Sequence, residues 1–196
     1  MSTASQSHSL VGLASSLALL VGAVGCATPS QQAGKESTRL SDAQIAAIVT
    51  TANGIDVDNG SLAIERSSND QVKQFAKRMM EDHTSVNQAA FALVTRLGVA
   101  PEETDTSRGL AASADKTRRT MRGLTGADFD KAYVDNEVAY HAAVIEVLDT
   151  VLIPSAQNAE LKSMLVNVRP AFVAHLEHAR SIQASLGGAA PGGHAL

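Results

Sequence analysis

Five polar residues fall on the apolar stripes of predicted helices, and their side-chain types could bind a metal ion. Imidazole and carboxylate groups are common protein ligands of Zn, Cu and Fe ions. A polar group that is buried without a partner costs several kcal/mol, so these side chains should meet one another, water or an ion. The candidate ligands are Asp56, Asp82, His83, His141 and His175, with Glu137 and His178 as weaker candidates at i, i+4 and i, i+3 spacing.

Two interpretations of this group remain open from the sequence. Ferritin-like di-iron sites take Glu-x-x-His from two helices, but the residues three positions before the histidines here are Met80, Val138 and Phe172. A Cu, Zn or single Fe ion therefore fits the group better than an oxo-bridged pair. The interpretation that the sequence favours is a structural network without metal, in which Asp82 or Asp56 orients a neighbouring imidazole.

Other kinds of chemistry find no support in the sequence. It contains no Gly-rich phosphate loop and no nucleophile elbow. The formal net charge of −4 and the lack of a Lys/Arg block give no reason to expect nucleic acid as a partner. The sequence therefore indicates no enzyme class, and a non-catalytic role is the first expectation.

Four long helices are needed to position the candidate ligands. Hydrophobic residues make up 44 % of the chain and aromatic residues only 3 %, which suits helix-on-helix packing. The apolar periodicity predicts long helices at about 41–67, 69–98, 128–151 and 156–186, and a short one near 110–121. Ser41, Asn69, Asp128 and Ser155 are the predicted N-caps. Gly54 and Gly60 should allow close contact between helices.

The lengths of the connections predict the topology. A short link after residue 67 and a tight turn at 153–155 each require an antiparallel hairpin. About thirty residues separate the second long helix from the third, which is too long for a simple up-down connection. The sequence thus predicts an all-α, ferritin-like four-helix bundle in which a long crossover carries the short helix and joins two antiparallel hairpins.

The N-terminal segment is typical of a secretory leader that ends at the single cysteine. Residues 9–25 form an uncharged apolar run, too short for the roughly 20 residues of a membrane span. Cys26 follows Ala23-Val24-Gly25, which resembles the lipobox of bacterial lipoproteins although Ala23 stands where Leu is usual. We expect a signal peptide at 1–25, a lipidated Cys26 with a flexible tether at 26–40, the bundle at 41–186 and a disordered tail at 187–196. The alternative is an ordinary secretory signal.

The predicted bundle resembles a family of bacterial ferritin-like proteins, domain of unknown function family 4142, whose members are described as outer membrane proteins. The resemblance covers about residues 41–186, and its most specific stretches are 72–87, 124–141 and 169–179. It implies the fold and a location in the cell envelope, with no established reaction. Together with the lipobox, this predicts an outer membrane lipoprotein that faces the periplasm and is held by its N-terminal lipid. Protein partners and oligomeric state are not implied. The alternative function is a metal-binding or metal-dependent redox protein that uses the buried His/Asp cluster.

Overall fold

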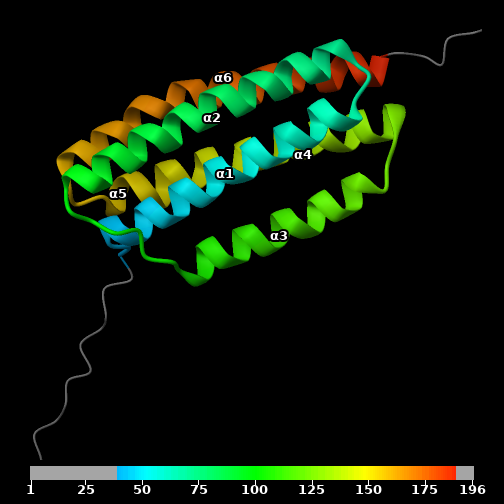
Figure 1. The fold of residues 1–196 in the computed structure, drawn as a ribbon. Helices are drawn as coiled ribbons and strands as arrows, with labels where there is room; N and C mark the ends of the chain where they lie inside the picture. The colour runs from blue at the N-terminus through cyan, green and yellow to red at the C-terminus, as the bar shows by residue number, and fades with distance from the viewer. Residues whose placement is uncertain (1–38, 189–196) are drawn as a thin grey trace, which may run out of the picture. The chain divides into compact units, whose positions relative to one another are not determined.

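The computed structural model describes residues 39–188, and this part of the chain contains helices and no strand. The predicted signal peptide, Cys26 and residues 189–196 of the predicted tail lie outside the described residues, whereas Gly187 and Gly188, predicted to belong to the disordered tail, are helical. Figure 1 shows the helices in chain order. They are α1 (Asp42–Arg66), α2 (Asp70–Arg96), α3 (Asp105–Arg122), α4 (Gly126–Val147), the π-helical turn η1 (Leu148–Leu152), α5 (Ile153–Ser155) and α6 (Ala159–Gly188).

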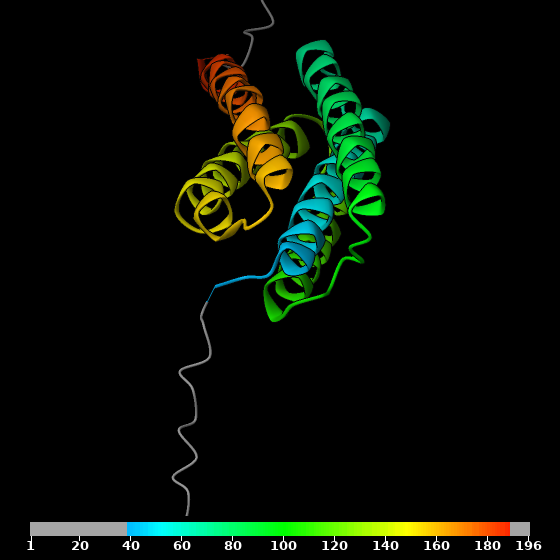
Figure 2. The same cartoon turned by 90° about the vertical axis from the view of Figure 1, so that its left-hand side faces the viewer.

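Two antiparallel hairpins build the bundle, as the sequence predicts. The α1/α2 hairpin packs against the α4/α6 hairpin, with α2 beside α6 and α1 beside α4. Figures 1 and 2 show α3 running back along the outside of this bundle, where it contacts α1 and α4. The α3 crossover makes α2 and α4 run in the same direction. This is the ferritin-like arrangement, and the predicted fold class is confirmed.

Helix boundaries follow local capping chemistry, and this confirms two predicted N-caps. Ser41 and Gln44 form a reciprocal capping box, and the Asn69 side chain accepts hydrogen bonds from two backbone amides of α2. Gly98 adopts φ 65° just after α2, a left-handed conformation that costs glycine nothing.

Three predicted boundaries were wrong. The α3 crossover helix has 18 residues and begins at a capping box between Thr104 and Ser107, so it is longer than the apolar pattern indicated. The α4 helix begins at Gly126, and Asp128 lies inside its first turn. The cap of α6 is Asn158, whose Oδ1 accepts from two backbone amides, and not Ser155. Polar residues in succession offer several caps, and only the tertiary turn selects one.

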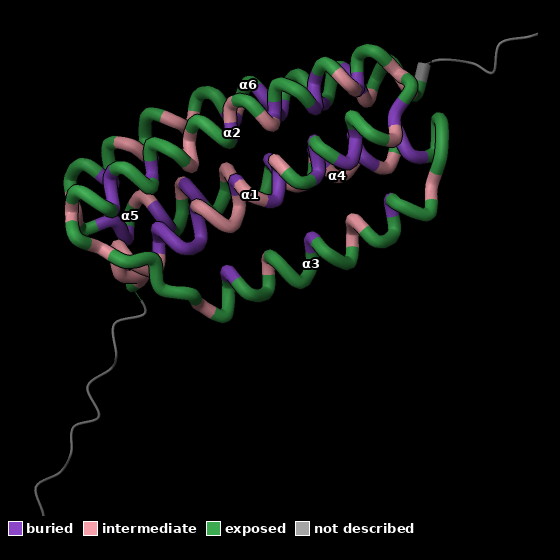
Figure 3. Tube along the Cα trace, viewed as in Figure 1, coloured by how far each residue is buried: buried purple, intermediate pink, exposed green. Residues whose placement is uncertain are grey.

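The hydrophobic core is divided into two clusters along the bundle. One cluster includes Leu62, Phe75, Met79, Tyr133 and Ile182. The other includes Ile45, Ile48, Leu148, Leu165 and Phe172. On each of α1, α2, α4 and α6, buried polar residues lie between the segments that belong to the two clusters; Asp130 of α4 is buried within the first segment instead. A polar layer therefore crosses the middle of the core, and Figure 3 shows how buried positions recur between exposed ones along the bundle helices.

Gly60 marks a close approach between α1 and α2. A Cβ atom at this position would lie 2.8 Å from the backbone oxygen of Ala76, so only glycine fits. Nothing lies within 4 Å of the corresponding point at Gly54, so the prediction of a close contact there was wrong.

The α4 segment has a mixed surface. The stretch Gly126–Ser155 is long and apolar enough to cross a membrane by length and composition. Phe129, Tyr133 and Glu137 of this stretch are nevertheless fully buried against other helices. Val147 and Val151, apolar residues of the predicted third long helix, are 37 % and 39 % exposed.

Candidate metal centre

The polar layer gathers side chains from all four bundle helices. Each residue of this layer is at most 3 % exposed. They are Asn53, Asp56 and Asn59 on α1, His83 on α2, Glu137 and His141 on α4, and His175 on α6. Because each bundle helix supplies at least one member, the layer exists only when both hairpins are docked.

Three imidazole rings form the centre of this layer. The ring centroids of His83 and His141 are 5.6 Å apart, those of His83 and His175 are 5.3 Å apart, and those of His141 and His175 are 5.5 Å apart. Phe172 stacks on the His83 ring at 5.2 Å and closes one side. One ring nitrogen from each histidine lies within 4.8 Å of the other two, a separation that suits a shared ion.

Each of these rings is held at one nitrogen by an oxygen acceptor. His83 Nδ1 donates to Asn53 Oδ1 at 2.7 Å, and the Asn53 amide is itself oriented because its Nδ2 donates to the carbonyl of Val49. His141 Nδ1 donates to the backbone carbonyl of Glu137 at 3.0 Å. His175 Nε2 donates to the Asp82 carboxylate at 2.8 Å. An acceptor oxygen requires the proton on the facing nitrogen, so these contacts fix the tautomers.

The opposite nitrogen of each ring then carries a lone pair. His83 Nε2, His141 Nε2 and His175 Nδ1 are buried and have no hydrogen-bond partner among the described residues. This is the arrangement of metal-binding histidines, in which one ring nitrogen donates to an oxygen and the other binds the ion.

Two carboxylates adjoin the imidazoles. Asp56, Glu137 and His141 form a second group whose ligand atoms also lie within 4.8 Å of one another, so His141 belongs to both groups. Asp56 Oδ2 is 3.5 Å from His83 Nε2, and Glu137 Oε2 is 3.5 Å from His141 Nδ1. Asp56 Oδ1 and both oxygens of Glu137 lack hydrogen-bond partners of ordinary geometry among the residues described. The three imidazoles thus form one possible ligand set, and Asp56 and Glu137 form a second, adjoining set with His141.

Burial controls the protonation of this group. It lowers the pKa of His83 to about 3 and that of His141 to about 4, and the neighbouring imidazoles add to both shifts. Burial also lowers the pKa of His175, against the opposing effect of Asp82. All three rings are therefore neutral near pH 7, which is the form that binds metal.

The carboxyl groups shift in the opposite direction. Burial raises the pKa of Glu137 to about 7, although the surrounding side chains of Asp56, Asn136 and Asn59 favour its ionised form. Burial, and then the nearby Glu137 carboxylate, raise the pKa of Asp56 well above its ordinary value. A divalent ion beside the two carboxyl groups would stabilise their charged forms.

An ion can reach bonding distance of the histidines with small movements. If all three nitrogens were separated by the 4.8 Å limit, their centre would lie about 2.8 Å from each. Metal–nitrogen bonds are about 2.0–2.1 Å long, so each ring would move inward by about 0.7 Å.

The structure gathers most, but not all, of the candidates from the sequence. Asp56, His83, His141, His175 and the weaker candidate Glu137 lie together in the polar layer. Asp82 is at the rim, with 38 % of its side chain exposed, and bonds His175 and Arg78. Burial raises the Asp82 pKa, but the bonds from His175 and Arg78 outweigh this effect and hold it below its usual value.

His178 lies outside the group, and Asn53 is an addition to it. His178 is exposed and packs its ring edge-on against Phe75 at 5.2 Å. Asn53 was not a sequence candidate, although it lies three residues before Asp56 and six before Asn59 on one helical face. This i, i+3, i+6 run of polar residues is the signal that could have identified it.

The fold and the polar layer define a ferritin-like helical bundle with a buried histidine–carboxylate cluster. The chain belongs to the family described as domain of unknown function DUF4142, whose family model matches residues 27–182. No curated protein matches the chain.

A solved structure shares the fold. It is a protein of DUF305 from Streptomyces coelicolor that is described as secreted. It aligns with a TM-score of 0.63 at 11 % sequence identity, covering 77 % of this chain and 96 % of the other. At this identity the similarity concerns the fold alone.

Proposed function

We propose that this protein binds one divalent transition-metal ion in the core of its bundle. His83, His141 and His175 bind the ion through nitrogen, and Asp56 and Glu137 supply carboxylate oxygens. The observation that carries the proposal is the state of the three rings. Each has one nitrogen held by an oxygen acceptor and the other buried without a partner in the described part of the chain.

A structural network without metal accounts less well for this geometry. Such a network would use the buried nitrogens and oxygens in hydrogen bonds, because an unsatisfied buried group costs about 1–3 kcal/mol. Within residues 39–188, three imidazole nitrogens have no hydrogen-bond partner, and Asp56 Oδ1 and both Glu137 oxygens have none of ordinary geometry, although Asp56, Asn136 and Asn59 adjoin Glu137. A divalent cation at this place would bind the imidazole nitrogens and offset the charge of the two carboxylates.

The ligand set narrows the choice of metal. Imidazole nitrogen with carboxylate oxygen suits Zn, Cu and Fe ions better than Ca or Mg ions, which prefer oxygen alone. Met79 is four residues before His83 and thioethers bind copper, but Met79 is fully buried in the first hydrophobic cluster with Phe75 and Ala76, which favours a packing role over a ligand role. The proposal includes no enzymatic reaction.

We further propose that the bundle works in the cell envelope, attached by a lipid on Cys26. The apolar leader and its single cysteine support this location, as does the described secretion of the DUF305 protein that shares the fold. A Cys26→Ala variant should move from the membrane fraction to the soluble periplasm. Unchanged fractionation would refute the lipid anchor and leave the metal site untouched.

Elemental analysis tests the metal site. Protein purified without a metal-affinity tag should carry about one equivalent of Zn, Cu or Fe per chain, or take up one from solution. His83→Ala and His141→Ala should abolish that equivalent. His178→Ala is the matched control, because it removes an exposed histidine of the same bundle. Wild-type protein that remains metal-free under saturating metal would refute the proposal, as would equal losses in the control.

A further inference from the structure

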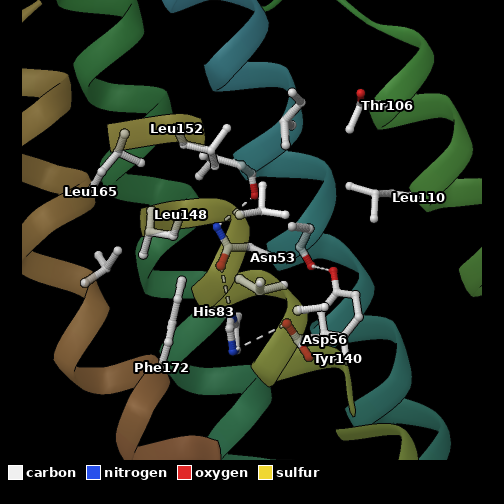
Figure 4. A pocket seen from close by; sticks show the side chains of 17 residues that line it. Asn53, Asp56, His83, Thr106, Leu110, Tyr140, Leu148, Leu152, Leu165 and Phe172 are labelled. Carbon is white, nitrogen blue, oxygen red and sulfur yellow. Dashed lines mark hydrogen bonds and ion pairs between the residues drawn. The ribbon is translucent and has the colours of Figure 1, made fainter. Parts of the chain in front are cut away.

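An apolar cavity ends at the proposed metal site. Its volume is about 140 Å³, and twelve of its seventeen lining residues are apolar. Exposed residues of α3 and α4, Thr106, Ala143 and Val147, line the cavity together with the buried residues Asn53, Asp56 and His83. Figure 4 shows Thr106 and Leu110 on one side of the space and His83, Asp56 and Phe172 across from them.

The cavity has few groups that could hold water. The Asn53 amide is already used in bonds to His83 and to the carbonyl of Val49. The Tyr140 hydroxyl donates to the carbonyl of Ala52 at 3.0 Å. Among the buried lining atoms of the described chain, His83 Nε2 and Asp56 Oδ1 are the ones without a hydrogen bond, and both would face the ion. Apart from these two atoms at its far end, the wall that the described residues form offers no free buried polar partner, and an apolar cavity of this kind stays dry and binds small apolar molecules.

The size and position of the cavity limit its occupant. A cavity of about 150 Å³ with Leu, Ile and Phe walls accommodates benzene or xenon, so this one suits a molecule of a few heavy atoms. A charged solute would lose its hydration against the apolar walls. The far end lies beside His83, one of the proposed ligands, so the occupant would lie beside the ion.

We infer that this cavity binds a small uncharged apolar molecule, of which dioxygen is the representative, and presents it to the metal. This inference rests on the proposed metal site for its purpose, but occupancy of the cavity is measurable in metal-free protein. The π-helical turn η1 contributes to its wall, since Leu148 and Leu152 both line it. Such turns recur beside functional sites because they widen the helix locally.

Paramagnetic relaxation of methyl groups by dissolved dioxygen tests the inference in metal-free protein. The methyl groups of Val144, Leu148 and Leu165 line the cavity, whereas those of Leu62 and Ile182 are buried in the other cluster. The cavity methyls should relax several-fold faster under dioxygen than the control methyls. Uniform relaxation across both sets would overturn the inference.

Two matched variants complete the test. Ala143 lines the cavity and is exposed, whereas the adjacent Ala142 is exposed and does not line it. Ala143→Phe should abolish the excess relaxation, and Ala142→Phe should leave it unchanged. Equal behaviour of the two variants would overturn the inference.

Metal titration of the same variants separates the two proposals. Ala143→Phe should bind metal as wild type does, because it replaces no ligand. Dioxygen relaxation in a wild-type protein that binds no metal would refute the proposed function and leave the cavity occupied. Metal binding without excess relaxation would refute the cavity alone.

Discussion

Replacement of Asn53 by leucine should weaken metal binding by about 10–100-fold. Asn53 Oδ1 accepts from His83 Nδ1 at 2.7 Å, and both side chains are buried. Leucine has a similar size but no acceptor, so the His83 ring loses the contact that fixes its tautomer and orientation. Loss of such outer partners of metal ligands costs about 10–100-fold in affinity, which corresponds to about 1.4–2.8 kcal/mol.

Asn53→Asp distinguishes orientation from packing. The introduced carboxylate would keep an oxygen acceptor for His83 but, like leucine, would lose the bond from Asn53 Nδ2 to the carbonyl of Val49. The aspartate variant should therefore bind metal about as tightly as wild type or more tightly. Asn87→Leu is the outside control, because Asn87 bonds the carbonyl of Thr50 in the same hairpin and lies outside the polar layer.

Competition with a chromophoric chelator gives the affinities, and thermal unfolding of the metal-free variants checks that each folds. Metal-free Asn53→Leu should lose about 1–3 kcal/mol of stability from the unpaired His83 donor. Wild-type metal affinity in Asn53→Leu would refute the role assigned to this residue. An aspartate variant as weak as the leucine variant would refute it equally.

Three further predictions concern the pH, the packing and the metal. The pKa of Glu137 is about 7, so below pH 7 the ion must displace a proton from this side chain, and the metal affinity should rise from about pH 5 to 7. Calorimetric titration at several pH values measures this rise, and in Glu137→Gln the number of protons released on binding should fall by about one. Gly60→Ala should destabilise the protein by about 1–3 kcal/mol in chemical unfolding, because the added Cβ would meet the Ala76 backbone. Gly54→Ala should instead stabilise it by about 0.5–1 kcal/mol, since nothing lies near that position. Equal effects of the two variants would refute the close contact at Gly60. Metal at about 100 times its Kd should add about 2.7 kcal/mol and raise the Tm by about 5–10 °C, and a chelator that leaves the Tm of metal-loaded protein unchanged would contradict the site.

The fold was readable from the sequence because long apolar stripes and short links leave few arrangements. The stripe of α2, with Val72, Phe75 and Met79 fully buried, requires a long partner helix. The gap of about thirty residues after it excludes a simple up-down bundle. Individual caps were less readable, since Asp128 and Asn158 both carry suitable side chains and only the latter is placed at a helix start.

The candidate site was partly readable for a geometric reason. Asp82 and His83 are adjacent, and adjacent residues of an α-helix point about 100° apart, so the two side chains could not both enter one centre. Asp82 instead reaches the rim, where it bonds His175. The prediction that Asp82 bonds an imidazole therefore agrees with the structure. The prediction that Asp82 and His83 both bind one metal ion does not agree with the helix geometry.

Asn53 and Glu137 illustrate a second limit. The α1 helix is buried on a broad face because α2, α3 and α4 all contact it, so a single apolar stripe does not describe its interior. Residues such as Asn53 then look like edge positions although they are 3 % exposed. Glu137 is fully buried for a similar reason, since α4 contacts α1, α3 and α6. Periodicity identifies a buried face reliably only where a helix packs on one side.

The polar layer makes sense as a product of the fold because of its position between the two hydrophobic clusters. Each hairpin alone brings together only part of the ligand set: α1 and α2 carry Asp56 and His83, and α4 and α6 carry Glu137, His141 and His175. Only docking of the hairpins brings all five side chains together, and the crossover through α3 lets that docking occur with α2 beside α6. An ion bound to ligands from both hairpins would then hold the hairpins together at this level, whereas the metal-free layer retains unpaired polar atoms at the same level of the described bundle. Binding of the proposed ion should therefore be coupled to docking of the two hairpins, so its affinity should depend on the packing of the hydrophobic clusters as well as on the ligands.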